Sequence, residues 1–307
     1  MYIGSIEYVL GEKRKICTEE LLDAAKVQAV MLGGLQFYRK SSSSPEKLAM
    51  TAISKCLAKT SVNKNGIKAV VYATTMDTVT MNGRFDYKYI EANMHSFDLS
   101  GAYPFGVFLS QCANIISALR FARNTIIAEN IDSVIIVTTD VIPETSSRFM
   151  KDDLSILSDG ASACIVSRHP LEYKIDNITQ SINYSLDNIA NPLSATFARA
   201  NEIGKITRQH FVNEREAACL LKQIFTNNYN IPTMKFYAQQ FTNEMGEGAF
   251  DKIYMKNVRE NGHAFSSDTL INLKDYSDDG KLSLGDQVLL CATGQNRWGM
   301  VTLTVAK

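Results

Sequence analysis

The chain has 307 residues, of which 45% are hydrophobic and 21% are charged. This composition is typical of a globular protein large enough for one big domain or two fused halves. Lysines and arginines number 32, as do the acidic residues, so the formal net charge of zero argues against nucleic acid or an anionic membrane as the main partner. No apolar run reaches the roughly 18 residues of a membrane-spanning helix, and the N-terminus lacks a signal-like apolar core, so a cytoplasmic protein is expected.

The cysteines are dispersed, and no two of them form a Cys-x-x-Cys pair. This spacing predicts neither a disulfide framework nor a zinc site, and no metal is expected. The six positions are Cys17, Cys56, Cys112, Cys164, Cys219 and Cys291.

In chain order, the first half alternates helical apolar spacing with short buried-strand patterns. Serines at 41–44 and Pro45 mark the start of a helix. The aromatic and glycine-rich residues 80–106 lack a clear period and favour a functional loop region. The predicted elements are a helix at 47–59, a strand at 67–75, a helix after Cys112, and strands at 133–140 and 160–168.

The second half follows a similar plan. Its predicted elements are a strand at 173–185, a helix at 214–229, a strand at 233–241, helices around 248–257 and 266–275, and strands at 286–293 and 298–306. Three strands then match in order between the halves: 68–75 with 234–240, 134–140 with 287–293, and 162–168 with 300–306. We therefore expect two duplicated α/β halves, residues 1–167 and 168–307, with layered sheets sandwiched by helices.

Cys112 lies in "FLSQCANIISALRFARN", where a strand-like run gives way to an amphipathic helix. A cysteine in such a place is most often a small buried apolar residue. A helix N-terminus also lowers the pKa of a thiol, so this position also suits a nucleophile. The local pattern leaves both interpretations open.

Four stretches in order resemble the thiolase-fold condensing enzymes of the β-ketoacyl-ACP synthase III type. They are "SFDLSGAYPFGVFLSQCANIISALRFARN", "LSDGASACIVS", "ENGHAFSSDTLINLKD" and "LSLGDQVLLCATGQNRWGMVTLTV". The resemblance implies a five-layered α-β-α-β-α sandwich and a homodimer. It also implies that Cys112 takes an acyl group from a CoA or acyl-carrier-protein thioester. The oxyanion would then be held by backbone amides of Cys112 and of the turn at Gly294 and Gln295.

The chain departs from the family pattern at two catalytic positions. The family's His-Gln-Ala-Asn run has "FYAQQFTN" in its place, with Gln239 (or Gln240) as the nearest equivalent, and the family's catalytic Asn is replaced by His263. A subgroup that moves acyl groups onto oxygen or nitrogen has a His at that Asn position and an acid at the other. The identity of the acidic residue that would orient His263 stays open. Asp268 and Glu260 are near in sequence, but such carboxylates are mostly solvated or capping groups.

The leading hypothesis is therefore an acyltransferase in natural-product or fatty-acid-like biosynthesis, with His263 as base. Two alternatives are a C–C bond-forming ketosynthase and a non-catalytic partner subunit of an active homologue. The resemblance places Phe85, Tyr103 and Phe105 at the acyl pocket or the dimer interface. No tightly bound cofactor is expected. The expected thioester donor is acyl-CoA or acyl-carrier protein. The choice between them stays open because the family's usual CoA adenine pattern is not recognisable at the start of the chain.

Overall fold

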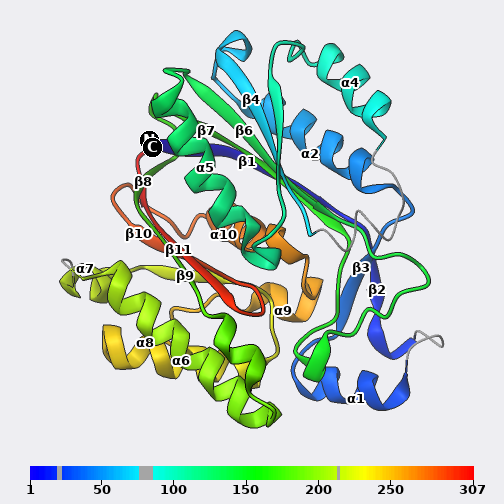
Figure 1. Ribbon diagram of the computed structural model, residues 1–307, viewed down its shortest axis with the longest axis vertical. Helices are drawn as coiled ribbons and strands as arrows, with labels where there is room; N and C mark the ends of the chain where they lie inside the picture. The colour runs from blue at the N-terminus through cyan, green and yellow to red at the C-terminus, as the bar shows by residue number, and fades with distance from the viewer. Residues whose placement is uncertain (19–22, 76–85, 213–214) are drawn as a thin grey trace.

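The computed structural model describes residues 1–18, 23–75, 86–212 and 215–307 (Figure 1). The strands are β1 (Tyr2–Leu10), β2 (Glu12–Lys15), β3 (Phe37–Lys40), β4 (Ile67–Ala73), β5 (Tyr103–Val107), β6 (Ser133–Asp140), β7 (Gly160–Ser167), β8 (Tyr173–Ile182), β9 (Gln223–Thr226), β10 (Gln287–Thr293) and β11 (Arg297–Val305). The α-helices are α1 (Ala24–Leu32), α2 (Pro45–Lys59), α4 (Tyr87–Ser96), α5 (Asn114–Ala128), α6 (Pro192–His210), α7 (Arg215–Leu220), α8 (Ile231–Met245), α9 (Lys256–Asn261) and α10 (Asp268–Asp278). None of these helices is both long and apolar enough to cross a membrane.

The main sheet is built from two similar halves. Within the described residues it has nine strands in the order β5-β4-β6-β7-β1-β8-β11-β10-β9. β4 pairs with β6 in parallel and β6 with β7 antiparallel, and β9, β10 and β11 repeat this pattern. A short antiparallel pairing between β1 and β8 joins the halves, and the proposed boundary after residue 167 falls between β7 and β8.

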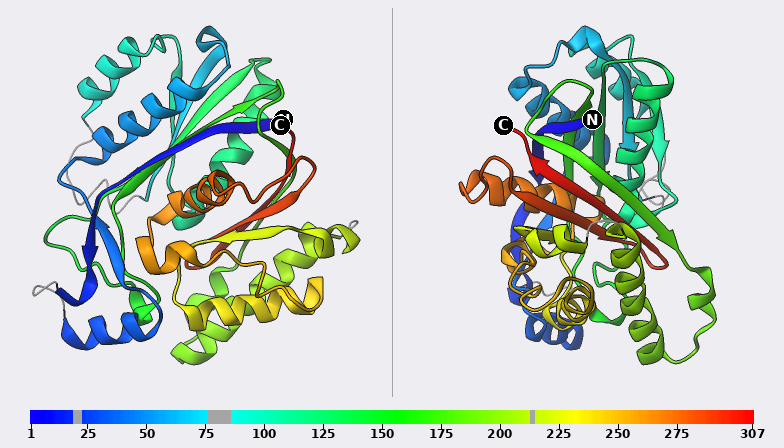
Figure 2. Two further views of the ribbon diagram at one scale, coloured as in Figure 1. Left: turned by 180° about the vertical axis from the view of Figure 1, so that it is seen from behind. Right: turned by 90° about the vertical axis from the view of Figure 1, so that its left-hand side faces the viewer.

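The helices and sheet halves form five layers (Figures 1 and 2). One apolar cluster joins α2 and α4 to the first half of the sheet. A second lies between the halves and includes Leu119 of α5 and Leu270 of α10. A third joins α6 and α8 to the second half. Burial of each helix's apolar stripe against a sheet face stabilises this stack, and the predicted α-β-α-β-α sandwich is confirmed.

The predicted strand at 233–241 is wrong, because these residues lie in helix α8. The helix begins where the Asn230 side chain accepts the Thr233 N–H at 2.9 Å, with Pro232 in the first turn. Its buried side chains recur at helical rather than strand spacing: Met234, Ala238, Phe241 and Met245. Aromatic and β-branched residues in the segment favour a strand, but this cap and this spacing override that local preference.

Two further elements of the second half also differ from expectation. Within the predicted helix at 214–229, only α7 is helical, and the short strand β9 follows it inside the same range. The predicted helix around 248–257 is mostly turn, and α9 starts only at Lys256. The partner of β4 in the repeat is therefore β9, since each pairs in parallel with the next strand of its half, and not the segment 234–240. The sequence did not identify β9, because its four residues are too few for hydrophobic periodicity to indicate a strand.

Candidate active site

Cys112 lies at the start of the helical segment that crosses the middle layer. A 3-10 turn, Gln111–Ala113, leads into α5, and the cysteine is 9% exposed. The Asn114 side chain fixes this junction, because its oxygen accepts the Ser110 N–H at 2.8 Å and its amide donates to the Thr74 carbonyl at 2.8 Å. The sulfur is thus held near a helix N-terminus, where the peptide dipoles favour negative charge.

His263 belongs to the second half of the chain, but backbone hydrogen bonds to the first half hold it in place. Its N–H donates to the Ile156 carbonyl at 2.8 Å, and its own carbonyl accepts the Ser158 N–H at 2.8 Å. Gly262 makes this approach possible: its φ is +62°, and a Cβ there would lie 2.7 Å from the Ile156 oxygen. The "SILSDG" turn therefore positions His263 through backbone contacts that do not depend on the side chains of the turn.

Gly262→Ala is expected to destabilise the protein by about 1–3 kcal/mol, because φ +62° with ψ −156° is a conformation that almost only glycine adopts. The clash with Ile156 should also displace His263 and reduce acyl transfer. Gly246→Ala is the matched control, since Gly246 has φ +86° and ψ 179° but open space around its Cβ position. Urea unfolding and an acyl-transfer assay would show both losses in the first variant and only a stability loss in the second. Equal activity in the two variants would contradict this role for Gly262.

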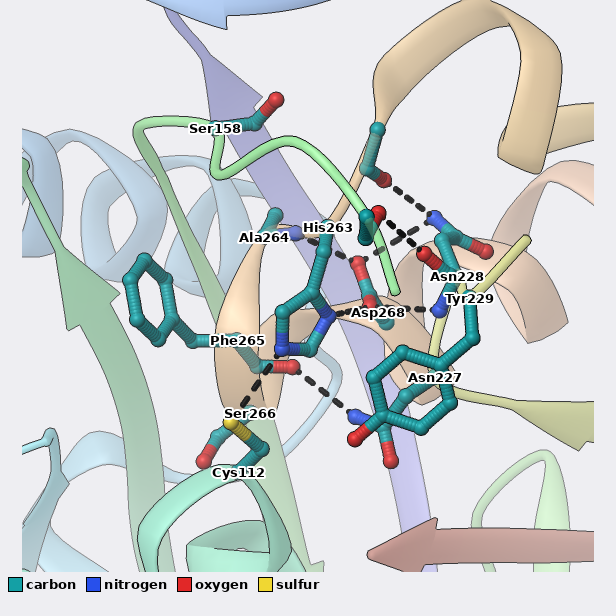
Figure 3. A network of polar contacts seen from close by, with 12 residues as sticks. Cys112, Ser158, Asn227, Asn228, Tyr229, His263, Ala264, Phe265, Ser266 and Asp268 are labelled. Atoms are coloured by element: carbon teal, nitrogen blue, oxygen red, sulfur yellow. Dashed lines mark hydrogen bonds and ion pairs between the residues drawn. The ribbon is translucent and has the colours of Figure 1, made fainter. Parts of the chain in front are cut away.

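Cys112, His263 and Asp268 form a buried line of three side chains (Figure 3). The Cys112 Sγ lies 3.1 Å from His263 Nε2, and His263 Nδ1 lies 2.5 Å from the Asp268 Oδ2. Both His263 and Asp268 are fully buried. The carboxylate accepts the Nδ1 proton and so directs Nε2 at the sulfur, which is the arrangement of a Cys-His nucleophile with an orienting acid.

The Asp268 carboxylate is held by the backbone and by one asparagine. Its Oδ1 accepts the Ala264 N–H at 2.8 Å and the Asn228 Nδ2 at 3.2 Å, and its Oδ2 accepts the Asn228 N–H at 2.8 Å (Figure 3). Asp268 also lies at the N-terminal end of α10. With all these donors fixed, the carboxylate has one orientation toward His263. Of the two acids that the sequence left open, Asp268 is the partner, while Glu260 pairs with Lys13.

Two opposing effects act on the pKa of His263. Burial lowers it, but the charge of Asp268 and the nearby Cys112 sulfur raise it more, to about 10. His263 therefore holds a proton at neutral pH. An imidazolium at this distance stabilises negative charge on the sulfur, which is the form that attacks carbonyl groups.

The residues directly after β9 complete the site, and sequence reasoning missed them. The Asn227 side chain accepts the Thr293 N–H at 2.7 Å and donates to the Phe265 carbonyl at 3.2 Å. The Tyr229 ring lies 5.2 Å from the His263 ring, between centroids, and burial raises the Tyr229 pKa. The polar run "NNYN" between an apolar strand and a proline was the signal that could have located this segment.

Gln239 does not lie with Cys112 and His263. It is exposed on α8 and donates to the Asn243 side chain at 3.2 Å. The prediction was wrong because it followed from reading 233–241 as a strand, which placed the expected strand end at 241 instead of 226. In the structure the strand end is at Thr226, so Asn227 occupies the corresponding place.

A cavity of about 740 Å³ opens beside Cys112. Aromatic side chains give it a largely apolar wall: Phe108, Tyr229, Phe236, Tyr237, Phe265 and Trp298. Of the predicted pocket residues, Tyr103 is 67% exposed and Phe105 packs on Phe121, and neither lines the cavity. Both lie on the edge strand β5, whose residues stop short of the cavity, and Phe85 lies outside the described residues.

The two turn residues expected at the oxyanion hole line this cavity, and their amides are bonded to protein atoms. The Gly294 N–H donates to the Arg297 carbonyl at 2.7 Å, and the Gln295 N–H donates to the Gln111 Oε1 at 2.8 Å. Gly294, Gln295, Gln111 and Cys112 all line the same space. The turn after β10 thus lies across this cavity from Cys112.

No family model matches the sequence, and no curated protein matches it. Solved structures do. The chain superimposes on ChlB3, described as an acyltransferase, with a TM-score of 0.82 and 15% identity over 100% of this chain and 98% of that one. It superimposes on 3-oxoacyl-[acyl-carrier-protein] synthase III from Aquifex aeolicus (TM-score 0.76, 17% identity, 99% of each chain) and from Pseudomonas aeruginosa (0.76, 18%, 100% and 98%). The protein has the thiolase fold of these structures.

Proposed function

We propose that the protein is a thioester-dependent acyltransferase in which Cys112 carries the acyl group and His263, oriented by Asp268, transfers protons. One observation carries this proposal: the three side chains are in line at 3.1 and 2.5 Å beside a cavity with an apolar wall. A cysteine kept for packing alone needs no histidine–carboxylate pair behind it. The same assembly argues against a non-catalytic partner subunit.

The loading step follows from the charges of the pair. The Cys112 thiolate attacks the carbonyl carbon of an acyl thioester, and the tetrahedral oxyanion then collapses. The new bond joins the Cys112 sulfur to the acyl carbon, the old C–S bond breaks, and the leaving thiolate takes the proton of His263. The products are a neutral acyl-cysteine, a free thiol and a neutral imidazole.

The transfer step uses the imidazole that loading leaves behind. Acylation removes the negative charge of Cys112, which is one of the causes that raise the His263 pKa. The neutral ring can then take the proton of an attacking hydroxyl or amine. The acceptor forms a bond to the acyl carbon, and the Cys112 thiolate leaves and restores the ion pair with His263.

The surroundings of Asn227 favour this reaction over decarboxylative C–C bond formation. That alternative needs two donors aimed at a malonyl thioester carbonyl. The Asn227 amide already donates to the Phe265 carbonyl, and its oxygen is used by Thr293. His263 Nε2 remains beside Cys112, 3.1 Å from the sulfur, and a proton carrier suits an alcohol or amine acceptor.

The donor thioester is proposed to be acyl-CoA or an acylated carrier protein, with no tightly bound cofactor. Within the described residues, the cavity is lined by Lys151, Arg199 and Arg297 and by no acidic side chain. These cations suit the phosphate of a pantetheine arm, while the apolar wall suits the acyl chain.

Intact-protein mass spectrometry would test the function. The wild-type protein would be mixed with a panel of acyl-CoA and acyl-carrier thioesters, and a stoichiometric acyl adduct is expected. The adduct would then be chased with alcohols, amines or a malonyl thioester. Loss of the adduct to an alcohol or amine supports the proposal, whereas loss only to the malonyl thioester would support the condensing alternative. No adduct from any donor would reject both.

The chain is proposed to form a homodimer through the edge strand β5. In the described residues this edge has no further strand beside it, and its Tyr103 side chain is 67% exposed, with Leu109, 70% exposed, just after the strand. Tyr103→Asp is expected to weaken the dimer by more than about tenfold, because a charge would be buried at the interface. Leu284→Asp, at an equally exposed leucine (75%) elsewhere, is the control. Light scattering on a sizing column would measure both, and a monomeric wild type would contradict the proposal.

A further inference from the structure

The side chain of Gln111 occupies an unusual place next to the nucleophile. Its Oε1 accepts the N–H of Gln295 at 2.8 Å, and both residues line the Cys112 cavity. The backbone of Gln111 has φ +51°, a region that few residues other than glycine adopt. Its own carbonyl accepts the Ser266 hydroxyl at 3.0 Å. The residue before Cys112 is thus held in a costly conformation that turns its carboxamide toward the turn after β10.

The turn does not need Gln111 to keep its shape. The Gly294 N–H is bonded to the Arg297 carbonyl, and the Gln295 carbonyl accepts the Arg199 Nε at 3.1 Å. The Gln295 side chain donates to Asp187 at 3.1 Å. Of the two polar backbone groups of Gln295, the carbonyl is bonded to Arg199, and the N–H is bonded to the side chain of Gln111, the residue before Cys112.

The approach between the two segments is close. A Cβ on Gly294 would lie 2.9 Å from the Ser110 carbonyl and 3.0 Å from the Gln111 Oε1. Only a glycine lets the Gln295 N–H come so near the residues that precede Cys112. This N–H consequently faces the region where a carbonyl group under attack by the sulfur has to lie.

The atom bound at the Gln295 N–H, the Gln111 Oε1, resembles the carbonyl oxygen of a substrate. A carboxamide oxygen and a thioester oxygen are both neutral carbonyl acceptors, and a site that binds one suits the other. The oxyanion that forms during attack is a stronger acceptor than either, so it competes well for the same N–H. We infer that the Gln111 oxygen is an internal stand-in for the thioester carbonyl oxygen, bound at the Gln295 N–H in the resting protein and displaced on acylation. This inference rests on the proposed acyl transfer.

The inference predicts opposite effects for two substitutions at one position. Gln111→Ala frees the Gln295 N–H and should speed acyl loading of Cys112 by about two- to tenfold, the worth of one neutral hydrogen bond. Gln111→Glu supplies a charged acceptor that holds the N–H more tightly, and should slow loading by a similar factor. Gln239→Ala, at an exposed glutamine on α8, is the control and should load like the wild type.

Rapid-quench mass spectrometry with one acyl-CoA would give the loading rates, and alkylation by iodoacetamide would be run beside it. Alkylation displaces iodide at carbon and forms no oxyanion, so Gln111→Ala should leave its rate unchanged. Slower or equal loading in Gln111→Ala with normal alkylation would overturn the inference while leaving acyl transfer in place. A wild-type protein that is alkylated but never acylated would reject the proposed function, and with it this inference.

Discussion

The Cys112→Ala protein is expected to form no acyl adduct with any thioester and to lose at least about 10³-fold in acyl transfer. The reason is that the sulfur is both the atom that attacks and the atom that carries the acyl group. Since the side chain is small and next to a cavity, the truncation should cost little stability. Intact-mass spectrometry of the protein after incubation with thioester would measure the adduct.

Cys219→Ala is the matched control for this experiment, because Cys219 is exposed, its thiol donates to the Met245 carbonyl, and it does not line the Cys112 cavity. It should acylate like the wild type. An adduct that persists in Cys112→Ala, and that peptide mapping places on another residue, would show that the nucleophile is not Cys112.

The Asp268→Asn protein is expected to lose about 10²- to 10⁴-fold in acyl transfer, because an amide can neither balance the imidazolium charge nor fix the tautomer of His263. The pKa of His263 should fall well below about 10, since burial still lowers it and only the Cys112 sulfur still raises it once the carboxylate is gone. NMR titration of isotope-labelled histidines would follow this shift. His210, whose pKa burial lowers to about 4, serves as an internal reference.

The same substitution should change how stability depends on pH. A pKa raised in the folded protein contributes stability that is fully present below about pH 6.5 and is lost as the pH rises through about 10. Asp268→Asn removes that dependence. Asp275→Asn is the control on the same helix, since Asp275 bonds to Tyr8 and Asn257 and not to His263. If both variants left the His263 pKa unchanged, Asp268 would not be the acid that orients it.

Much of the fold could be predicted where local pattern and burial agree. The strands β4, β6 and β7 each contain a short apolar run typical of a buried strand, and α2 has a serine cap, a proline in its first turn and helical apolar spacing. The segment 233–241 shows the limit. Its residue types favour a strand, but the Asn230 cap, the helical spacing of its buried side chains and their packing against the second sheet half make it a helix.

The same contrast holds for the site. Cys112 could be singled out because the motif around it is continuous in sequence, whereas the junction of strand and helix alone left its role open. His263 was predictable from its place in a second motif. Asp268 could not be singled out, because its contact with His263 forms only when the 3-10 turn Phe265–Ser267 and the start of α10 bring position 268 back beside position 263.

The sequence by itself therefore determined the layered α/β architecture and singled out Cys112 and His263. Only the tertiary structure identified Asp268 as the acid bonded to His263. It alone also showed the hydrogen bonds of Asn227 and the contact between Gln111 and Gln295. Each of these joins residues from different elements, and a hydrogen bond across such elements depends on distances of a few tenths of an ångström. Spacing along a chain carries no information at that scale until the folded layers bring the segments together.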